Sequence, residues 1–253
     1  MTFQWSMVGT TAVNGVRLGV REAGDPAGTP VVLLHGSGSN ASTWDRFAVR
    51  LSAAGHRVIA ADLRGHGSSD RTADYRLDSI RDDVLGLLAA LELRDAVLVG
   101  HSVGGHAALA AALSSTDRIA RLVLEDLAAP PRQRGSVKGF NPVQALAAVA
   151  GIVSARHDYS LRAVGSILRQ LTRPDPEWWG RLGEVRTPTL ILSGGSTSCI
   201  PPRRLAEATE AIAGARLTTI PVGHRVHSLA PDRFATEVLT FLAEPVAKPV
   251  RSR

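Results

Sequence analysis

Cysteine and long apolar runs are the scarcest features of this chain. Cys199 is the single cysteine among 253 residues, which excludes an internal disulfide and a cysteine-rich metal site. No apolar run approaches the roughly 20 residues that cross a bilayer, so we expect no membrane association. The segment from Met1 to Gly15 has no basic stretch followed by an apolar one. We therefore expect no signal peptide and a cytoplasmic protein.

Aromatic residues are also few, at 4% of the chain, whereas the net charge is +6. A nucleic-acid-binding surface typically combines a basic patch with aromatic residues on which bases stack. Here the positive charge comes almost entirely from scattered arginines, so we expect no nucleic-acid partner. The composition, 44% hydrophobic and 21% charged, is typical of one large globular domain, with or without an insertion. The sequence does not indicate an oligomeric state.

Short apolar runs alternate with segments of helical spacing over most of the chain. The expected strands are residues 3–8, 16–22, 31–34, 58–62, 97–99, 122–125, 189–193 and 217–220. Asn14-Gly15 predicts a hairpin turn between the first two. Continuous apolar runs such as Val31 to Leu34 are typical of strands that helices bury on both faces. We therefore predict an α/β fold with a doubly wound, mostly parallel, eight-stranded sheet.

Residues 129–186 interrupt the alternation, because no strand is evident among them. Helices are expected at about 142–154, at 160–171 and around Trp178-Trp179. A helical insertion at this point predicts a small lid over the carboxyl ends of the strands, where open α/β sheets bind ligands. We therefore expect a core of residues 1–128 and 187–244, a lid of residues 129–186, and a flexible tail of residues 245–253.

The most informative motif is Gly100-His101-Ser102-Val103-Gly104, which follows an apolar strand and precedes an alanine-rich segment. The order of strand, sharp turn and helix predicts a strained backbone at Ser102, with its hydroxyl at the tip of the turn. Side chains at Gly100 and Gly104 would clash with the packed strand and helix. The backbone N–H of Val103, at a helix N-terminus, would face an anion that forms beside Ser102.

Three further motifs accompany this turn, and in order along the chain they are His35-Gly36, Asp62-Leu63-Arg64-Gly65-His66-Gly67-Ser68 and Gly223-His224. Together with the turn at Ser102 they resemble the α/β-hydrolase family, over roughly residues 15–242. The resemblance implies Ser102 as nucleophile and His224 as catalytic histidine. It also implies an oxyanion hole built from the backbone N–H groups of Val103 and Ser37.

The other histidines are weaker candidates. His227, three residues after His224, is its rival, although it is also expected to begin the next helix or to line the pocket. The remaining histidines lie inside turn motifs, where a structural role is expected, or away from the loops after the strands; they are His35, His66, His101, His56, His106 and His157.

The catalytic acid departs from the family pattern. The family usually carries an aspartate in the loop after strand seven, but here residues 193–201 contain no carboxylate, and Thr197 or Ser198 would fill its place. Some members, such as haloalkane dehalogenases, carry the acid after strand six, which in this chain ends in Glu125-Asp126. Register along the strand favours Asp126, with Glu125 as the alternative acid. A serine–histidine dyad without an acid is the third possibility.

Asp62 is a third candidate acid by residue type, but it lies in a loop that usually braces the structure of this family. Cys199 lies in the loop after strand seven, but a lone cysteine with no designated base is more often a small packing residue. No phosphate-binding glycine loop and no histidine–cysteine ligand cluster is present, so we expect no cofactor and no metal.

The sequence therefore predicts a serine hydrolase that cleaves a small apolar ester or lactone through an acyl-enzyme intermediate. Apolar residues of the expected lid would line the acyl or ring pocket, or simply pack; they are Val143, Leu146, Val149, Ile152 and Val153. One alternative is a non-hydrolytic biosynthetic enzyme, a cyclase or lyase, which the altered acid loop suggests. The other is a binding or sensor protein with low turnover.

Overall fold

The structure, a computed structural model, describes residues 4–114, 117–133 and 158–245. These residues form one eight-stranded sheet in the order β1-β2-β4-β3-β5-β6-β7-β8. The strands are β1 (Met7–Val13), β2 (Val16–Gly24), β3 (Pro30–Leu34), β4 (Arg57–Ala61), β5 (Ala96–His101), β6 (Ile119–Glu125), β7 (Thr189–Ser193) and β8 (Arg216–Thr219). The pairings of β2 with β1 and with β4 are antiparallel, and the other five pairings are parallel. The predicted mostly parallel sheet is confirmed.

The N-terminal hairpin differs from its prediction in one strand. β1 begins at Met7 rather than at residue 3, and it runs directly into the turn at Asn14 and Gly15. Both turn residues have positive φ, +48° and +78°, as a tight two-residue hairpin requires. Because such a turn pairs the residues on its two sides, Val13 faces Val16, and this pairing sets the register of the hairpin.

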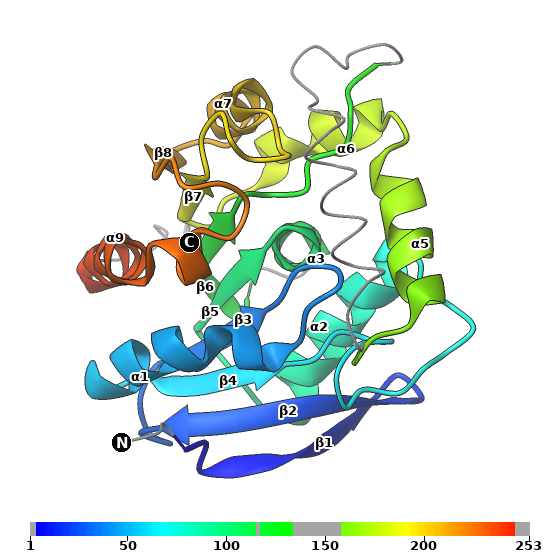
Figure 1. Cartoon of the computed structure of the whole chain (residues 1–253). Coiled ribbons are helices and arrows are strands. Elements are labelled where there is room, and N and C mark those ends of the chain that lie inside the picture. Colours follow the sequence, from blue (N-terminus) through cyan, green and yellow to red (C-terminus); the bar gives the residue numbers. More distant parts are fainter. Residues whose placement is uncertain (1–3, 115–116, 134–157, 246–253) are drawn as a thin grey trace, which may run out of the picture.

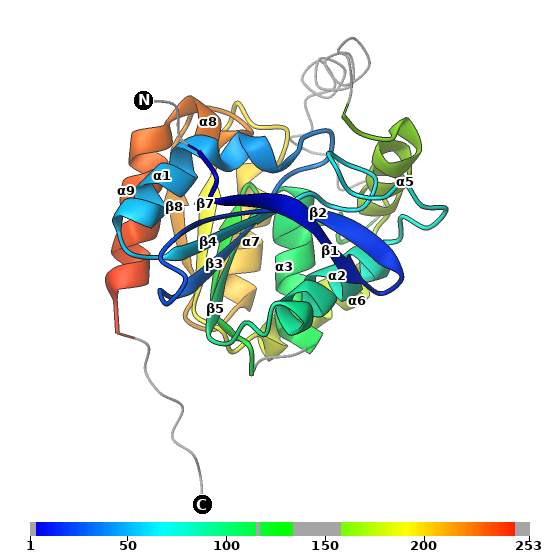
Figure 2. The ribbon, with the colours of Figure 1, turned by 90° about the horizontal axis from the view of Figure 1, so that it is seen from below.

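Helices cover both faces of the sheet (Figures 1 and 2). One face packs against η1 (Ala41–Trp44), α1 (Asp45–Ala53), α8 (Val226–Leu229) and α9 (Pro231–Ala243). The other packs against α2 (Leu77–Ala90), α3 (Val103–Ser114) and α7 (Pro202–Ala211). The side chains of Val31, Val32 and Leu33 are therefore fully buried, as expected for strands between two helical layers. Among the described residues, no helix combines the length and apolarity that a membrane span needs.

The described part of the insertion after β6 is helical. It contains α5 (Leu161–Leu171), α6 (Pro176–Arg181) and the short η2 (Leu182–Glu184). Ile167 and Trp179 join the apolar cluster beneath α2 and α3, and the indole N–H of Trp179 donates to the carbonyl of Pro130 at 2.9 Å. The expected helix at about 142–154 and most of the expected tail lie outside the described residues. The lid boundaries stay a prediction.

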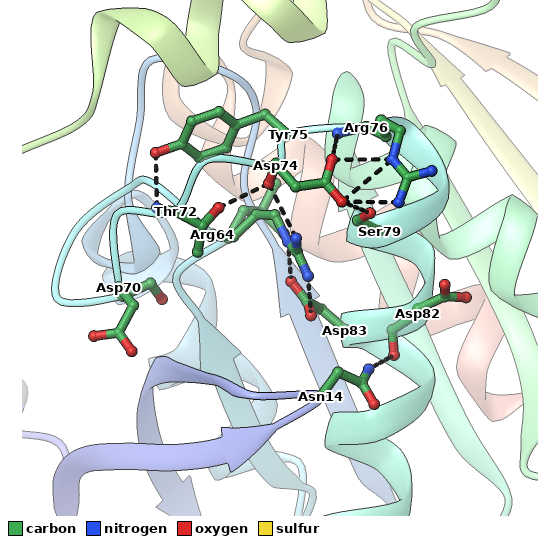
Figure 3. A network of polar contacts seen from close by, with 12 residues as sticks. Asn14, Arg64, Asp70, Thr72, Asp74, Tyr75, Arg76, Ser79, Asp82 and Asp83 are labelled. Carbon is green, nitrogen blue, oxygen red and sulfur yellow. Dashed lines mark hydrogen bonds and ion pairs between the residues drawn. The ribbon is translucent and has the colours of Figure 1, made fainter.

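A buried ion pair ties the loop after β4 to α2 (Figure 3). Nε and Nη2 of Arg64 donate to the two carboxylate oxygens of Asp83, each at 2.6 Å. Arg64 also donates to the carbonyl of Asp74 at 3.0 Å. Such two-pronged contacts fix orientation as well as distance, so the loop that starts at Asp62 is held firmly against α2.

Candidate active site

Ser102 lies in the sharp turn between β5 and α3. Its φ is +52°, a left-handed conformation that is costly for a residue with a side chain and that clusters at functional sites. The surrounding backbone fixes it, because its N–H donates to the carbonyl of Glu125 at 2.9 Å and its own carbonyl accepts from the N–H of His106 at 3.0 Å. The strained turn predicted from the sequence is present.

The two glycines of the motif are required by close backbone contacts. A Cβ at Gly100 would lie 2.4 Å from the carbonyl of Gly104, and a Cβ at Gly104 would lie 2.2 Å from the carbonyl oxygen of Leu34. Both distances are far below van der Waals contact, and the atoms met are backbone atoms. Only glycine therefore lets α3 start so close to β3 and β5.

The turn after β3 lies beside Ser102. A Cβ built on Gly36 would be 3.4 Å from Cβ of Ser102. Ser37 follows directly, and its hydroxyl oxygen is buried without a hydrogen-bond partner among the described residues. Val103 is the first residue of α3, so its N–H has no acceptor within the helix. Val103 thus follows Ser102 directly in the chain, and the turn that leads into Ser37 lies beside the serine.

Asp126 and His224 are in direct contact. Oδ2 of Asp126 lies 2.6 Å from Nδ1 of His224, and the carboxylate is completely buried whereas the imidazole side chain is 30% exposed. Asp126 has a φ of +45°, and its N–H still donates to the carbonyl of Leu192 in β7 at 2.7 Å. The end of β6 therefore turns the carboxylate toward the loop that carries His224.

The loop after β7 supplies the other partners of this carboxylate. The backbone N–H of Gly194 donates to Oδ1 of Asp126 at 2.9 Å, and the hydroxyl of Ser198 donates to Oδ2. In the sequence, Ser198 is only one of two residues that could fill the usual position of the acid. The structure gives it a distinct part, since it hydrogen-bonds the carboxylate that comes from the neighbouring strand.

Electrostatics differ sharply between neighbouring histidines. Burial by itself lowers the pKa of His224, but hydrogen bonds with Asp126 and Cys199 stabilise its cation and leave the pKa raised. Burial holds the pKa of His101 well below its usual value, and the nearby His224 and His227 lower it further. His101 is therefore neutral, and its Nε2–H donates to the carbonyl of His224 at 2.8 Å. This bond ties the histidine loop to the residue before Ser102.

Glu125 contacts a different histidine. Its carboxylate oxygens lie 2.9 and 2.7 Å from Nδ1 of His227, and both side chains are buried. The Nε2 of His227 lies 2.7 Å from the hydroxyl oxygen of Thr43. From the sequence, Glu125 and His227 were expected only as rivals of Asp126 and His224. The two pairs are nested, because the earlier acid meets the later histidine, so order along the chain gave no signal for this contact or for Thr43.

The remaining motif residues support the turns. Oδ1 of Asp62 accepts from the N–H of Ala41 at 2.6 Å, and Oδ2 accepts from the N–H of Ser68 at 2.9 Å. Nε2 of His35 accepts from the N–H of Leu63 at 2.9 Å, and Nε2 of His66 accepts from the N–H of Gly38 at 3.2 Å. These contacts join the loop after β4 to the turn after β3.

Comparisons with known proteins agree with this architecture. The profile of the alpha/beta hydrolase family matches residues 31–237. The 2-hydroxymuconate semialdehyde hydrolase of Pseudomonas sp. (strain CF600) is 31% identical over 261 residues, which cover 91% of this chain and 92% of that protein. The crystal structure of the enol-lactonase of Burkholderia xenovorans LB400 superposes with a TM-score of 0.74 at 26% identity, over 93% of this chain and 100% of that chain.

A further solved structure shows the same fold at lower identity. E-2-(acetamidomethylene)succinate hydrolase has a TM-score of 0.80 at 23% identity, over 94% of this chain and 99% of that chain. The family profile spans most of the chain, and the Pseudomonas hydrolase is similar over nearly its whole length. This chain therefore belongs to the alpha/beta hydrolase family, and the relatives named here are hydrolases.

Proposed function

We propose that this protein is a serine hydrolase that cleaves a small apolar ester or lactone. The contact that carries the proposal is the 2.6 Å approach of Asp126 to Nδ1 of His224, on the histidine loop that His101 ties to the Ser102 turn. A buried carboxylate at Nδ1 fixes the tautomer whose Nε2 is free to accept a proton. A serine hydroxyl needs such a base before it becomes a useful nucleophile.

The proposed reaction assigns a role to each of these residues. The Oγ of Ser102 attacks the carbonyl carbon while His224 takes its proton, and backbone N–H groups of Val103 and Ser37 stabilise the oxyanion. His224 then returns the proton to the leaving alkoxide, which departs as an alcohol and leaves an acyl-serine. Water, deprotonated by His224, attacks the acyl-serine and releases the carboxylic acid together with free Ser102.

The substrate class rests on two kinds of support. An enol-lactonase and an esterase from Exiguobacterium antarcticum are among the proteins of similar structure, and both names denote cleavage of carboxylic esters or their cyclic forms. The apolar character rests on the residues expected to line the pocket between Val143 and Val153, which lie outside the described residues. The buried Asp126 also weakens the case for a cyclase or lyase, because the missing acid motivated that alternative.

The decisive experiment is labelling with a fluorophosphonate probe. Wild-type protein should be labelled once, on Ser102, and Ser102→Ala should lose the label while remaining folded by circular dichroism. Ser114→Ala is the matched control, because Ser114 lies exposed at the end of α3 and should not affect labelling. A label that persists in Ser102→Ala would refute the proposed nucleophile.

Turnover separates the three functions considered. A short-chain nitrophenyl ester should give a burst of nitrophenol followed by steady hydrolysis, and a panel of lactones should give hydroxy acids that incorporate oxygen from isotopically labelled water. A sensor protein would give neither a burst nor steady turnover. A cyclase or lyase would form product without incorporating oxygen from water.

A further inference from the structure

The second buried pair, Glu125 and His227, is held on several sides. The exposed fractions are 0% for Glu125 and 3% for His227. Glu125 accepts from the ring Nδ1 and also from the backbone N–H of His227, at 2.9 Å to Oε1. The ring of His227 lies 4.3 Å from that of Trp44, centroid to centroid. Both the position and the tilt of this imidazole are thus fixed.

The hydroxyl of Thr43 completes the group at the other ring nitrogen. Its oxygen lies 2.7 Å from Nε2 of His227, so both ring nitrogens have partners. The result is a continuous chain of hydroxyl, imidazole and carboxylate from Thr43 through His227 to Glu125. We call these three residues the His227 clamp.

The members of the His227 clamp come from three segments, and each segment also carries a group of the proposed reaction. Glu125 directly precedes Asp126 at the end of β6. His227 follows His224 by three residues. Thr43 belongs to η1, which follows the turn that contains Ser37. We propose that His227 is a positioning residue, which holds the acid, the histidine loop and the oxyanion turn in register; the inference rests on the proposed function.

The geometry at the end of β6 explains why register matters. Glu125 is the last residue of β6 and Asp126 follows it with a φ of +45°, so the two adjacent carboxylates contact two different histidines of one loop. Movement at Glu125 is therefore transmitted to its neighbour through one peptide unit. Misplacement of a reacting group by about 1 Å costs on the order of a hundredfold in rate. A clamp on all three segments limits such displacement.

The charged and titratable neighbours of His227 are few among the described residues. Glu125 contacts it, and His101 lies 5.2 Å away between ring centroids. His101 is neutral because burial holds its pKa far below the usual value. The aromatic rings of Trp44 and Phe234 complete the surroundings. Loss of the His227 ring leaves the buried carboxylate of Glu125 without its ring partner, so a variant that keeps a donor to Glu125 is needed to separate position from charge.

The test compares substitutions that keep or remove each contact. His227→Phe removes both contacts of the ring, the one to Glu125 and the one to Thr43. His227→Asn places an amide N–H near the position of Nδ1 and so keeps a side-chain donor to Glu125. The measured quantity is the rate constant of fluorophosphonate labelling at Ser102, followed against pH. His227→Phe should slow labelling by roughly thirtyfold or more and move the acid limb to lower pH, because the bond from Asp126 that raises the pKa of His224 is weakened. His227→Asn should restore most of the rate.

Two controls separate positioning from stability. Phe241→Ala removes a buried ring from α9 and should lower Tm without changing the labelling rate per folded molecule. Thr43→Val and Thr43→Ser form a milder pair, with the valine variant about threefold or more slower and the serine variant near wild type. If His227→Phe is folded and labels at the wild-type rate and pH midpoint, the proposal is wrong. If His227→Phe does not fold, equal rates for Thr43→Val and wild type overturn the proposal.

A spectroscopic measurement keeps the two proposals distinguishable. The proton between His224 Nδ1 and Asp126 should give a low-field imidazole N–H signal in proton NMR. His227→Phe should broaden or shift it, and His227→Asn should restore it. If wild-type protein resists the fluorophosphonate, the serine mechanism fails while this signal still tests the clamp. If His227→Phe folds and its signal is unchanged, the clamp is refuted. If His227→Phe does not fold, an unchanged signal in Thr43→Val refutes it.

Discussion

Oδ2 of Asp126 lies 2.6 Å from Nδ1 of His224, although 98 positions separate the two residues in the chain. The carboxylate comes from the end of β6, and the loop after β7 contributes a hydroxyl and a backbone N–H to it instead of an acid. The usual position of the acid is thus filled by residues that hydrogen-bond the relocated carboxylate.

The first prediction concerns this carboxylate. Asp126→Asn should lower kcat by roughly 10²–10⁴, because an amide keeps the shape but no longer stabilises the imidazolium; in serine proteases the same change costs about 10⁴. Steady-state hydrolysis of a nitrophenyl ester measures the effect. Asp232→Asn, at an exposed carboxylate, is the control. Full activity of Asp126→Asn would leave a dyad of Ser102 and His224.

The pH profile provides a second prediction. The hydrogen bond from Asp126 raises the pKa of His224 against the effect of burial, and only the neutral imidazole acts as a base. Replacement of Asp126 by asparagine removes the group that favours the cation, so the acid limb of kcat/KM should move to lower pH while the plateau falls. A limb that stays in place would assign the titration to another group.

Ser198→Ala tests the contribution of the loop after β7. The substitution removes one of three hydrogen bonds to the Asp126 side chain. A hydrogen bond to a charged group contributes about 1.5–3 kcal/mol, so we expect kcat to fall about tenfold or more. Ser196→Ala, at an exposed position of the same loop, should have no effect. Equal activities of the two variants would contradict the contact.

Cys199 supplies a fourth prediction. Its thiol interacts with His224, but the proposed mechanism gives it no step. Cys199→Ser should therefore retain most of the hydrolytic activity. A loss of more than about a hundredfold, equivalent to about 2.7 kcal/mol of barrier, would reveal a chemical role for the thiol. The measurement is kcat for a nitrophenyl ester, with Tm as the check on folding.

The buried ion pair of Arg64 and Asp83 allows a prediction of stability. Asp83→Ala leaves a buried guanidinium without its partner, which typically costs about 3–5 kcal/mol, and Tm should fall by roughly 2–4 °C for each kcal/mol. Asp82→Ala removes the adjacent carboxylate, which is half exposed, and should cost less than about 1 kcal/mol. Thermal unfolding, monitored by circular dichroism, measures Tm for both variants. Similar losses of Tm would show that the buried pair stabilises the fold no more than the exposed carboxylate does.

The fold followed from the sequence because its signals are local. Continuous apolar runs such as Val31 to Leu34 specify buried parallel strands wherever helices follow them. Gly100 specifies the Ser102 turn through a local contact with the backbone of Gly104, whereas the contact that requires glycine at position 104 comes from Leu34 in β3. The first strand was misplaced because the residues before Met7 carry an apolar pattern too, whereas pairing across the Asn14-Gly15 turn sets the true register.

The sequence was sufficient to predict the fold, the proposed nucleophile, two rival acids and two rival histidines. The pairing of each acid with its histidine depends on tertiary contacts alone. Glu125 and Asp126 are adjacent in the chain and chemically alike, and the choice depends on the positive φ of Asp126, the register of β6 on β7 and the approach of the loop after β8. The register and the approach of the loop relate segments 67 and 98 residues apart, and no local pattern records them.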